Sequence, residues 1–199
     1  MTDLITRLSG LSVGSPEDRA FANRAEARRQ SEDSYLLLLH PADSGPVSLV
    51  ERRAVAAFVA VLHQQPETAA HYRALLEGTD SVLAPTVLRL AESARGPGPW
   101  GRYPSGPLSH EDQPGAPFRL TREQRDAIGL RLAAALEHAH LLTLHPRDAS
   151  RDALQALLDA GWTTPGIVTL SQLVAFLAFQ IRVVAGLTVL QAARSAVPA

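Results

Sequence analysis

The sequence predicts an all-α protein, and three observations support that fold class. Apolar residues recur with a helical period in several segments, and no segment shows the alternation of a half-buried strand. Capping-box patterns, Ser48 to Glu51 and Thr121 to Gln124, each precede an apolar stretch. Residues 148–190 read as a short helix that ends at Gly161, followed by a long apolar helix. We therefore expect one helical bundle of about six to eight helices.

The segment from Ile167 to Val184 is the predicted centre of this bundle. It is apolar on nearly every side, and a helix of that kind is buried in a bundle or in lipid. Three polar residues interrupt it: Gln172, Gln180 and Arg182. Because a charge is costly inside a membrane span, we predict a core helix, capped by Thr164, and no membrane.

Composition excludes several classes of function. The chain has 199 residues, 46% of them hydrophobic, and a formal charge of -1, so it lacks the basic surface that nucleic acid or anionic lipid requires. It has no cysteine, which excludes disulfides, thiolate zinc sites and thiol redox chemistry. The first residues lack the pattern of a signal peptide, so we expect a cytoplasmic protein.

The chain reads as one domain, 1–199, in four parts. Residues 1–47 form an N-terminal arm, loose over 1–14 and then helical from Ser15 towards Leu39, with a break near Ser31. A first helical unit spans 48–94 and a second spans 120–199, beginning with a helix that ends before His145-Pro146. The Gly/Pro-rich loop 95–119 is either an ordered flap, packed by its aromatic residues Trp100 and Tyr103, or a mobile linker.

The two helical units resemble one another. When Ser48 is set on Thr121, Glu51 falls on Gln124 and Gln64 falls on Glu137. This pattern fits a duplicated helical unit, although two Ala/Leu-rich helices also align this well by chance.

Three segments together resemble the carboxymuconolactone decarboxylase and alkylhydroperoxidase-D-like superfamily. Residues 48–76 (SLVERRAVAAFVAVLHQQPETAAHYRALL) resemble its signature helix pair, and RDAIGLRLAAAL resembles its "REL…LRVA" helix. The stretches LLDAGWTTPGIVTL and AFLAFQIRVVAGL resemble its closing pattern. The resemblance implies the bundle of that family, no cofactor, and a homo-oligomer, a dimer or trimer, with a paralogous protein of the same family as a second possible partner.

The chain departs from this family at the redox cysteines. If His71 is the histidine of the family's Cys-x-x-Cys-x-x-x-His motif, Gln64 and Glu67 occupy the cysteine positions. Neither side chain forms a sulfenic acid, so thiol peroxidase chemistry is excluded. Two functions remain: a non-catalytic or divergent homo-oligomeric relative, or a cofactor-independent decarboxylase, lyase or isomerase acting on a small organic acid.

Glu67 and His71 are the candidate catalytic residues. They stand four residues apart, on one face of a helix, where a carboxylate can orient an imidazole for acid–base work. The alternative is a solvated pair that adds only a few tenths of a kcal/mol to stability.

The candidate substrate-binding residues are Arg182, Gln180, Gln64, Arg131 and His140. Arg182 lies in the most apolar helix, where it needs an acidic partner or a polar cavity. We expect Glu67, His71 and Arg182 to border one cavity, with Glu51 and Glu137 as other possible partners of the arginine. The alternative for Arg182 and Arg131 is a structural ion pair or a subunit interface.

Three histidines, His138, His140 and His145, lie near one helix end beside Glu137. His138 and His140 are two residues apart and point to different faces of a helix, so we predict no metal site. The interpretation we favour for these histidines is interaction with the negative end of the helix dipole.

Overall fold

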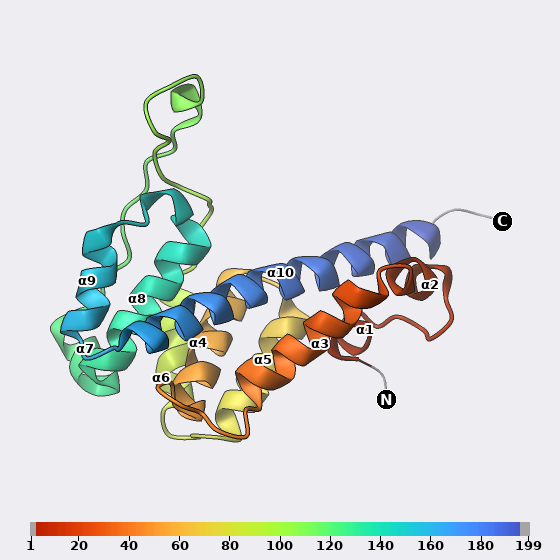
Figure 1. Cartoon of the computed structure of the whole chain (residues 1–199), viewed down its shortest axis with the longest axis horizontal. Coiled ribbons are helices and arrows are strands. Elements are labelled where there is room, and N and C mark those ends of the chain that lie inside the picture. Colours follow the sequence, from red (N-terminus) through yellow and green to blue (C-terminus); the bar gives the residue numbers. More distant parts are fainter. Residues whose placement is uncertain (1–2, 196–199) are drawn as a thin grey trace.

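The computed structural model describes residues 3–195 and folds them into an elongated helical bundle (Figure 1). The described residues form ten α-helices and two 3-10 helices: α1 (Leu4–Leu8), α2 (Pro16–Ala22), α3 (Ala25–Leu39), α4 (Leu49–Leu62), α5 (Pro66–Glu77), α6 (Ala84–Ser93), η1 (Ser109–Glu111), α7 (Arg122–Ile128), α8 (Leu130–Leu144), η2 (Pro146–Asp148), α9 (Arg151–Asp159) and α10 (Thr164–Ser195). Within this range the only β-type pairing is an isolated bridge between Gly101 and Gln113. The all-α prediction is confirmed, with more helices than expected.

Both capping boxes predicted from the sequence are present. The Ser48 side chain accepts from the Glu51 N–H and the Glu51 carboxylate accepts from the Ser48 N–H; Thr121 and Gln124 repeat the arrangement. The helix that begins after Thr121 is not continuous, however. Gly129 adopts φ +82°, which ends α7 and begins α8.

Helix α4 is the centre of the bundle, and it packs against α5, α6, α8 and α10. Ten of its fourteen residues are buried, and the small side chains of Ala54, Ala56, Ala57 and Ala60 let its neighbours approach closely. The prediction that Ile167–Val184 is the most buried helix is therefore wrong.

Helix α10 is buried on one face only. Its 32 residues extend about 48 Å at 1.5 Å per residue, whereas the helices that it packs against have 15 residues or fewer. They cannot surround it, and Phe179 remains 45% and Val168 51% exposed. The helix begins at Thr164 itself, and the side chain of Thr163 accepts from the Gly166 N–H, one residue before the predicted cap.

By length and composition, Thr164–Arg194 is apolar enough to cross a membrane. In the most apolar part of this segment, 39% of the residues are buried inside the bundle. A core helix of a soluble protein passes the same test, and α10 packs against α4, α8, α3 and α1.

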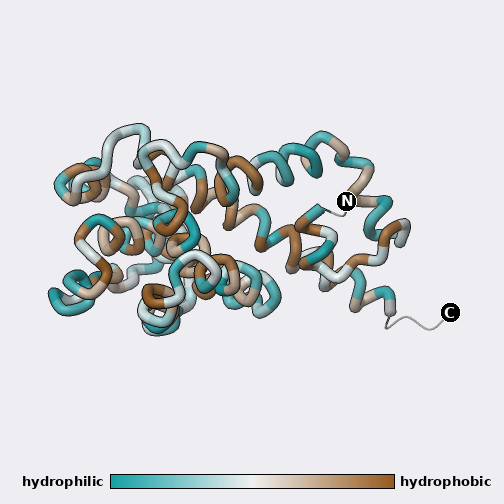
Figure 2. Tube along the Cα trace, turned by 90° about the horizontal axis from the view of Figure 1, so that it is seen from below, coloured by the Kyte–Doolittle hydropathy of each residue, from teal (hydrophilic) through white to brown (hydrophobic). Residues whose placement is uncertain are grey.

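The N-terminal arm is ordered, in contrast to the loose segment predicted for residues 1–14. Leu4 and Ile5 of α1 are buried, and Ile5 packs with Val184 and Leu187 of α10. Arg28 of α3 secures this arrangement through ion pairs to Asp3 and Asp18. Figures 1 and 2 show the result: most helices gather at a wide end, and a narrower end consists of α1, α2 and the C-terminal part of α10. The break expected near Ser31 lies instead between α2 and α3.

The predicted duplication has no counterpart in the helix boundaries. The first unit begins with the 14-residue α4 and the second with the seven-residue α7. Gly129, which separates α7 from α8, aligns with Ala56 in the middle of α4. Gln64, just after α4, aligns with Glu137 in the middle of α8.

Candidate functional site

The predicted catalytic pair does not form in the described structure. Glu67 is exposed on the first turn of α5 and makes no hydrogen bond or ion pair within residues 3–195. His71 is half-buried and turns to α3, where its Nε2 lies 3.1 Å from the Tyr35 hydroxyl. The same hydroxyl lies 2.9 Å from His40 Nε2. The pKa of His71 is lowered to about 4, mainly by burial and then by Arg7 and His40. His71 is therefore neutral at pH 7.

Arg182 does not join Glu67 and His71. It is exposed on α10, donates to the Ala178 carbonyl at 3.3 Å, and forms no ion pair within the described chain. Two of its three expected partners are engaged elsewhere: Glu51 pairs with Arg131, and Glu137 with Arg119 and Arg125. Four cavities formed by residues 3–195 have none of Glu67, His71 and Arg182 in their linings, in contrast to the cavity expected from the sequence.

Gln180 and Gln64 have local structural roles. Gln180 is fully buried, and its Oε1 accepts a hydrogen bond from the Tyr72 hydroxyl. Gln64 follows α4 with φ +56°, and its Oε1 accepts from Arg95 at 3.2 Å.

Arg131 connects α8 to the segments before α4 and α10. Its Nε lies 2.6 Å from Glu51 Oε1, and its two terminal nitrogens donate to the carbonyls of Gly161 and Pro46, each at 2.7 Å. The guanidinium also stacks 4.0 Å from the ring of Trp162. Each nitrogen of the guanidinium thus donates a hydrogen bond. Arg131 forms a structural ion pair with Glu51, which is the alternative that the sequence left open.

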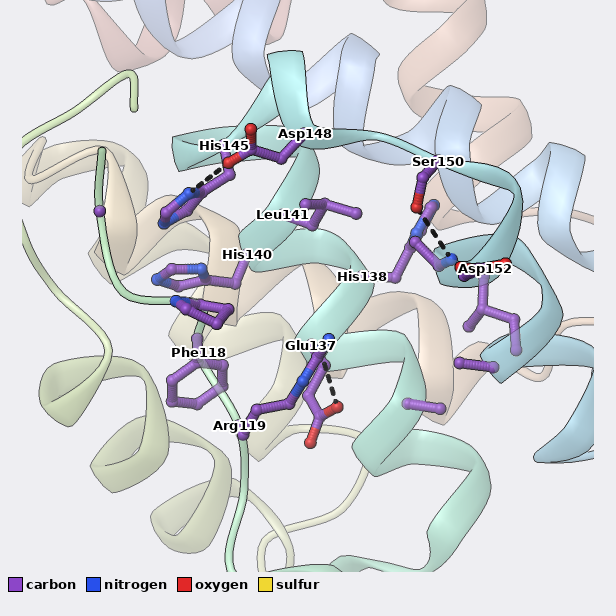
Figure 3. A pocket seen from close by; sticks show the side chains of 16 residues that line it. Phe118, Arg119, Glu137, His138, His140, Leu141, His145, Asp148, Ser150 and Asp152 are labelled. Atoms are coloured by element: carbon purple, nitrogen blue, oxygen red, sulfur yellow. Dashed lines mark hydrogen bonds and ion pairs between the residues drawn. The ribbon is translucent and has the colours of Figure 1, made fainter. Parts of the chain in front are cut away.

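A cavity of about 380 Å³ lies between α8, α9 and the end of the loop before α7 (Figure 3). Its apolar lining includes Phe118, Leu141 and Leu157, and its polar lining gathers Arg119, Glu137, three histidines and two aspartates. Of the predicted site residues, His140 alone lines it. The volume and the mixed lining are typical of a small-molecule site.

His145 is the side chain in this cavity best arranged for chemistry. It follows the last residue of α8 and is 2% exposed. Its Nδ1 lies 3.1 Å from Asp148 Oδ2 at the end of η2. In the tautomer whose Nδ1 proton the carboxylate accepts, Nε2 carries the lone pair. This atom is buried from solvent and has no hydrogen-bond partner in the described structure. An imidazole oriented by a carboxylate is the arrangement of a general base.

A column of rings holds His145 in place. The ring centroid of Trp100 lies 4.8 Å from that of His145, and the ring centroid of His140 lies 5.6 Å from it. His140 in turn stacks on Phe118 at 4.9 Å, and its Nε2 lies 3.2 Å from the Ala94 carbonyl. Burial lowers the pKa of His140 to about 4, so it adds no positive charge beside His145 at pH 7.

His138 lies on the opposite side of α8, towards α9 and α10. Its Nε2 lies 3.1 Å from the Ser171 hydroxyl, and its Nδ1 is buried without a partner in the described structure. Burial lowers its pKa to about 4. Within the described residues, no group of three or more His, Asp or Glu side chains is arranged to hold a metal ion.

Arg119 supplies the accessible cation of the cavity. Its side chain is 63% exposed, and its Nη1 lies 3.3 Å from Glu137 Oε2. The other oxygen of Glu137 already accepts from Arg125 and from the Leu120 N–H, each at 2.9 Å. Arg119 can therefore turn to an incoming anion while Arg125 continues to neutralise Glu137.

The loop between α6 and α7 covers His145 through Trp100. The Trp100 N–H donates to the Leu144 carbonyl at 2.7 Å, and Gly101 and Gln113 exchange backbone hydrogen bonds. A side chain at Gly115 would collide with Trp100, since a Cβ there would lie 2.5 Å from the indole. Tyr103 packs against Arg147 of η2 at 4.3 Å. Trp100 and Tyr103 are therefore both packed, as expected for the flap alternative.

Sequence reasoning found the histidines and missed the partner that orients one of them. The three histidines were recognised as a cluster, but Asp148 was not connected to His145. The signal that could have found it was a polar His-Pro-Arg-Asp run directly after a helix end, where a turn brings the first and fourth residues together.

No protein-family model matches this chain, and no curated protein matches it either.

Proposed function

We propose that this protein is a cofactor-independent acid–base enzyme that acts on a small organic acid in the cavity lined by His145. The observation that carries the proposal is the buried His145–Asp148 pair, whose Nε2 lone pair is unpartnered in the described structure beside a 380 Å³ cavity. His145 and Asp148 take the roles that sequence reasoning gave to His71 and Glu67.

The proposed chemistry uses the residues of the cavity alone. Arg119 binds the substrate carboxylate at the exposed side, while Phe118, Leu141 and Leu157 contact its carbon skeleton. Because Nε2 of His145 is covered in the described structure, the substrate must displace part of that cover when it binds. Nε2 then accepts a proton from a carbon next to a carbonyl group, and Asp148 stabilises the imidazolium that forms. The same proton, returned to another carbon or to a leaving group, completes an isomerisation or a lyase reaction.

Hydrogen–deuterium exchange tests this step with simple keto acids as probes. Pyruvate, laevulinate and phenylpyruvate are incubated with the protein in D₂O, and exchange at the carbon beside the carbonyl is followed by proton NMR. We expect exchange above the buffer rate with at least one acid, and a loss of about 100-fold in the His145→Gln variant, which is typical for a general base.

The matched control is His110→Gln, because His110 lies exposed on η1, away from the cavity. It should leave exchange unchanged. If no acid exchanges above background, or if His145→Gln exchanges as fast as the unaltered protein, the proposal is wrong.

The second candidate function is a non-catalytic helical module that assembles with itself. The resemblance to the carboxymuconolactone decarboxylase superfamily leads to the same expectation, as do the absent cysteines. The specific observation in its favour is the exposed apolar face of α10.

A further inference from the structure

An exposed strip runs along the full length of α10. It consists of Val168, Gln172, Ala175, Phe179, Arg182, Gly186, Val189 and Ala193, all of them exposed. These residues alternate in spacings of four and three, which is the heptad period of a coiled-coil seam. The opposite face of the helix packs on the bundle. The strip shares no residue with the cavity lined by His145.

The heptad spacing indicates that the strip binds another helix. From Val168 to Ala193 the strip spans 26 residues, about 39 Å at 1.5 Å per residue. A partner helix that covers it must be about as long, and α10 itself, with 32 residues, is such a helix.

Arg182 disfavours lipid as the occupant. It lies near the middle of the strip and has no acidic partner in the described chain. A bilayer would have to accept this charge at its centre, where an arginine is costly. An aromatic ring on a partner helix can instead accept the guanidinium on its face.

Gly186 also points to a close neighbour. A Cβ added at Gly186 would meet nothing within 4 Å, so its own chain does not require a glycine there. Glycine inside a helix is less favourable than alanine by about 1 kcal/mol. A second helix that approaches closely at this position would explain why the smallest side chain is present.

We propose that the strip is the interface of a symmetric dimer in which α10 pairs antiparallel with α10 of a second copy. With the two-fold axis between positions 180 and 181, Phe179 faces Arg182 of the partner subunit, and Ala175 faces Gly186 of the partner subunit. Gln172 then faces Val189 of the partner subunit, and Val168 faces Ala193 of the partner subunit. In this register each Phe179 ring faces an arginine. The small residues Ala175 and Gly186 face each other across the interface.

The parallel arrangement fails on charge. It would set Arg182 directly beside Arg182 of the partner subunit at the centre of the seam, with no acid in α10 to separate them. In the antiparallel arrangement the same surface serves both copies, as a two-fold interface requires. The bundles then lie on opposite sides of the paired helices, because each packs on the face of α10 opposite its strip.

A charge exchange tests both the dimer and its direction by sedimentation equilibrium. Phe179→Arg and Arg182→Glu should each raise the dimer dissociation constant at least about tenfold, the factor that corresponds to 1.4 kcal/mol. The double variant should recover the dimer, since in the antiparallel register each new cation faces a new carboxylate. Both positions are exposed, so circular dichroism should show the helical content unchanged in every variant.

The absence of native cysteines allows a direct test of the register. Ala175→Cys combined with Gly186→Cys should form intermolecular disulfides under mild oxidation. Neither single variant should do so, because each residue would lie about 16 Å along the helix from its own copy. A monomer at 100 μM, cross-linking in either single variant, or flotation with phosphatidylcholine vesicles in place of dimerisation would overturn the proposal.

Discussion

Helices α4 and α10 are both strongly apolar, yet only α4 is enclosed by the bundle. Phe58 of α4 is fully buried, whereas Phe179 of α10 is 45% exposed. The difference follows from length and position. Five helices of the bundle contact the 14 residues of α4, while the 32 residues of α10 extend beyond every neighbour. A helix that is apolar on all sides is therefore expected to be buried, but its sequence does not show whether other helices of the same chain bury all of its surface.

The largest expected difference between the two helices is in the cost of removing a phenylalanine. Phe58→Ala should lower the free energy of unfolding by about 3–5 kcal/mol, because it leaves a cavity at the centre of the bundle. Phe179→Ala should cost less than about 1 kcal/mol at concentrations where the protein is monomeric. Urea unfolding of both variants measures the two values. Equal losses would mean that α10 is as enclosed as α4.

Two arginines extend the comparison. Arg131 joins the capping box of α4 to α8 through Glu51 and two carbonyls, whereas Arg182 on α10 makes one contact within its own helix. Arg131→Ala should therefore lower the free energy of unfolding by about 1.5–3 kcal/mol, the range for hydrogen bonds of charged groups. Arg182→Ala should change it by less than about 0.5 kcal/mol in the monomer. Comparable effects of the two substitutions in urea unfolding would contradict this assignment.

The buried face of α10 contains a polar contact in which the Tyr72 hydroxyl donates a hydrogen bond to Gln180. Tyr72→Phe should destabilise the protein by about 1–3 kcal/mol, since it leaves the buried Gln180 carbonyl without a donor. Adding Gln180→Met should recover most of that loss, because both polar groups are then gone. The thermal midpoints of the single and double variants give the coupling between the sites. Strictly additive effects would show that the contact does not stabilise the fold.

The smallest expected effect is a pKa change where the two helices meet. His63 caps α4, and burial first, with Arg182 second, lowers its pKa from 6.5 to about 4. A neutral buried histidine contributes stability above pH 6.5 that is lost as the pH falls towards 4, because the unfolded chain binds the proton first.

Arg182→Gln should therefore raise the pKa of His63 slightly and reduce the loss of stability over that range. Proton NMR titration of the His63 ring measures the shift in its pKa. An unchanged pKa of His63 in the variant would show that Arg182 does not act on it.

Local signals in the sequence determined much of the secondary structure. The boxes at Ser48 and Thr121, the stop at Gly161 and the helix end at Leu144 depend on a few adjacent residues, so the chain alone is enough to find them. The histidine cluster was visible for the same reason. The chemistry that the sequence excluded, thiol redox and disulfides, depends on composition alone.

The tertiary structure decided which partner each polar side chain took and which apolar helix lies at the centre. By sequence, Glu51 could form an ion pair with either Arg131 or Arg182. It pairs with Arg131 because α8 lies close to the start of α4. The pairing of His145 with Asp148 depends on the turn through η2, and its cover depends on Trp100, 45 residues earlier in the chain. Burial and pairing are properties of distances between segments, and a helical pattern determines the faces of one segment without determining what lies against them.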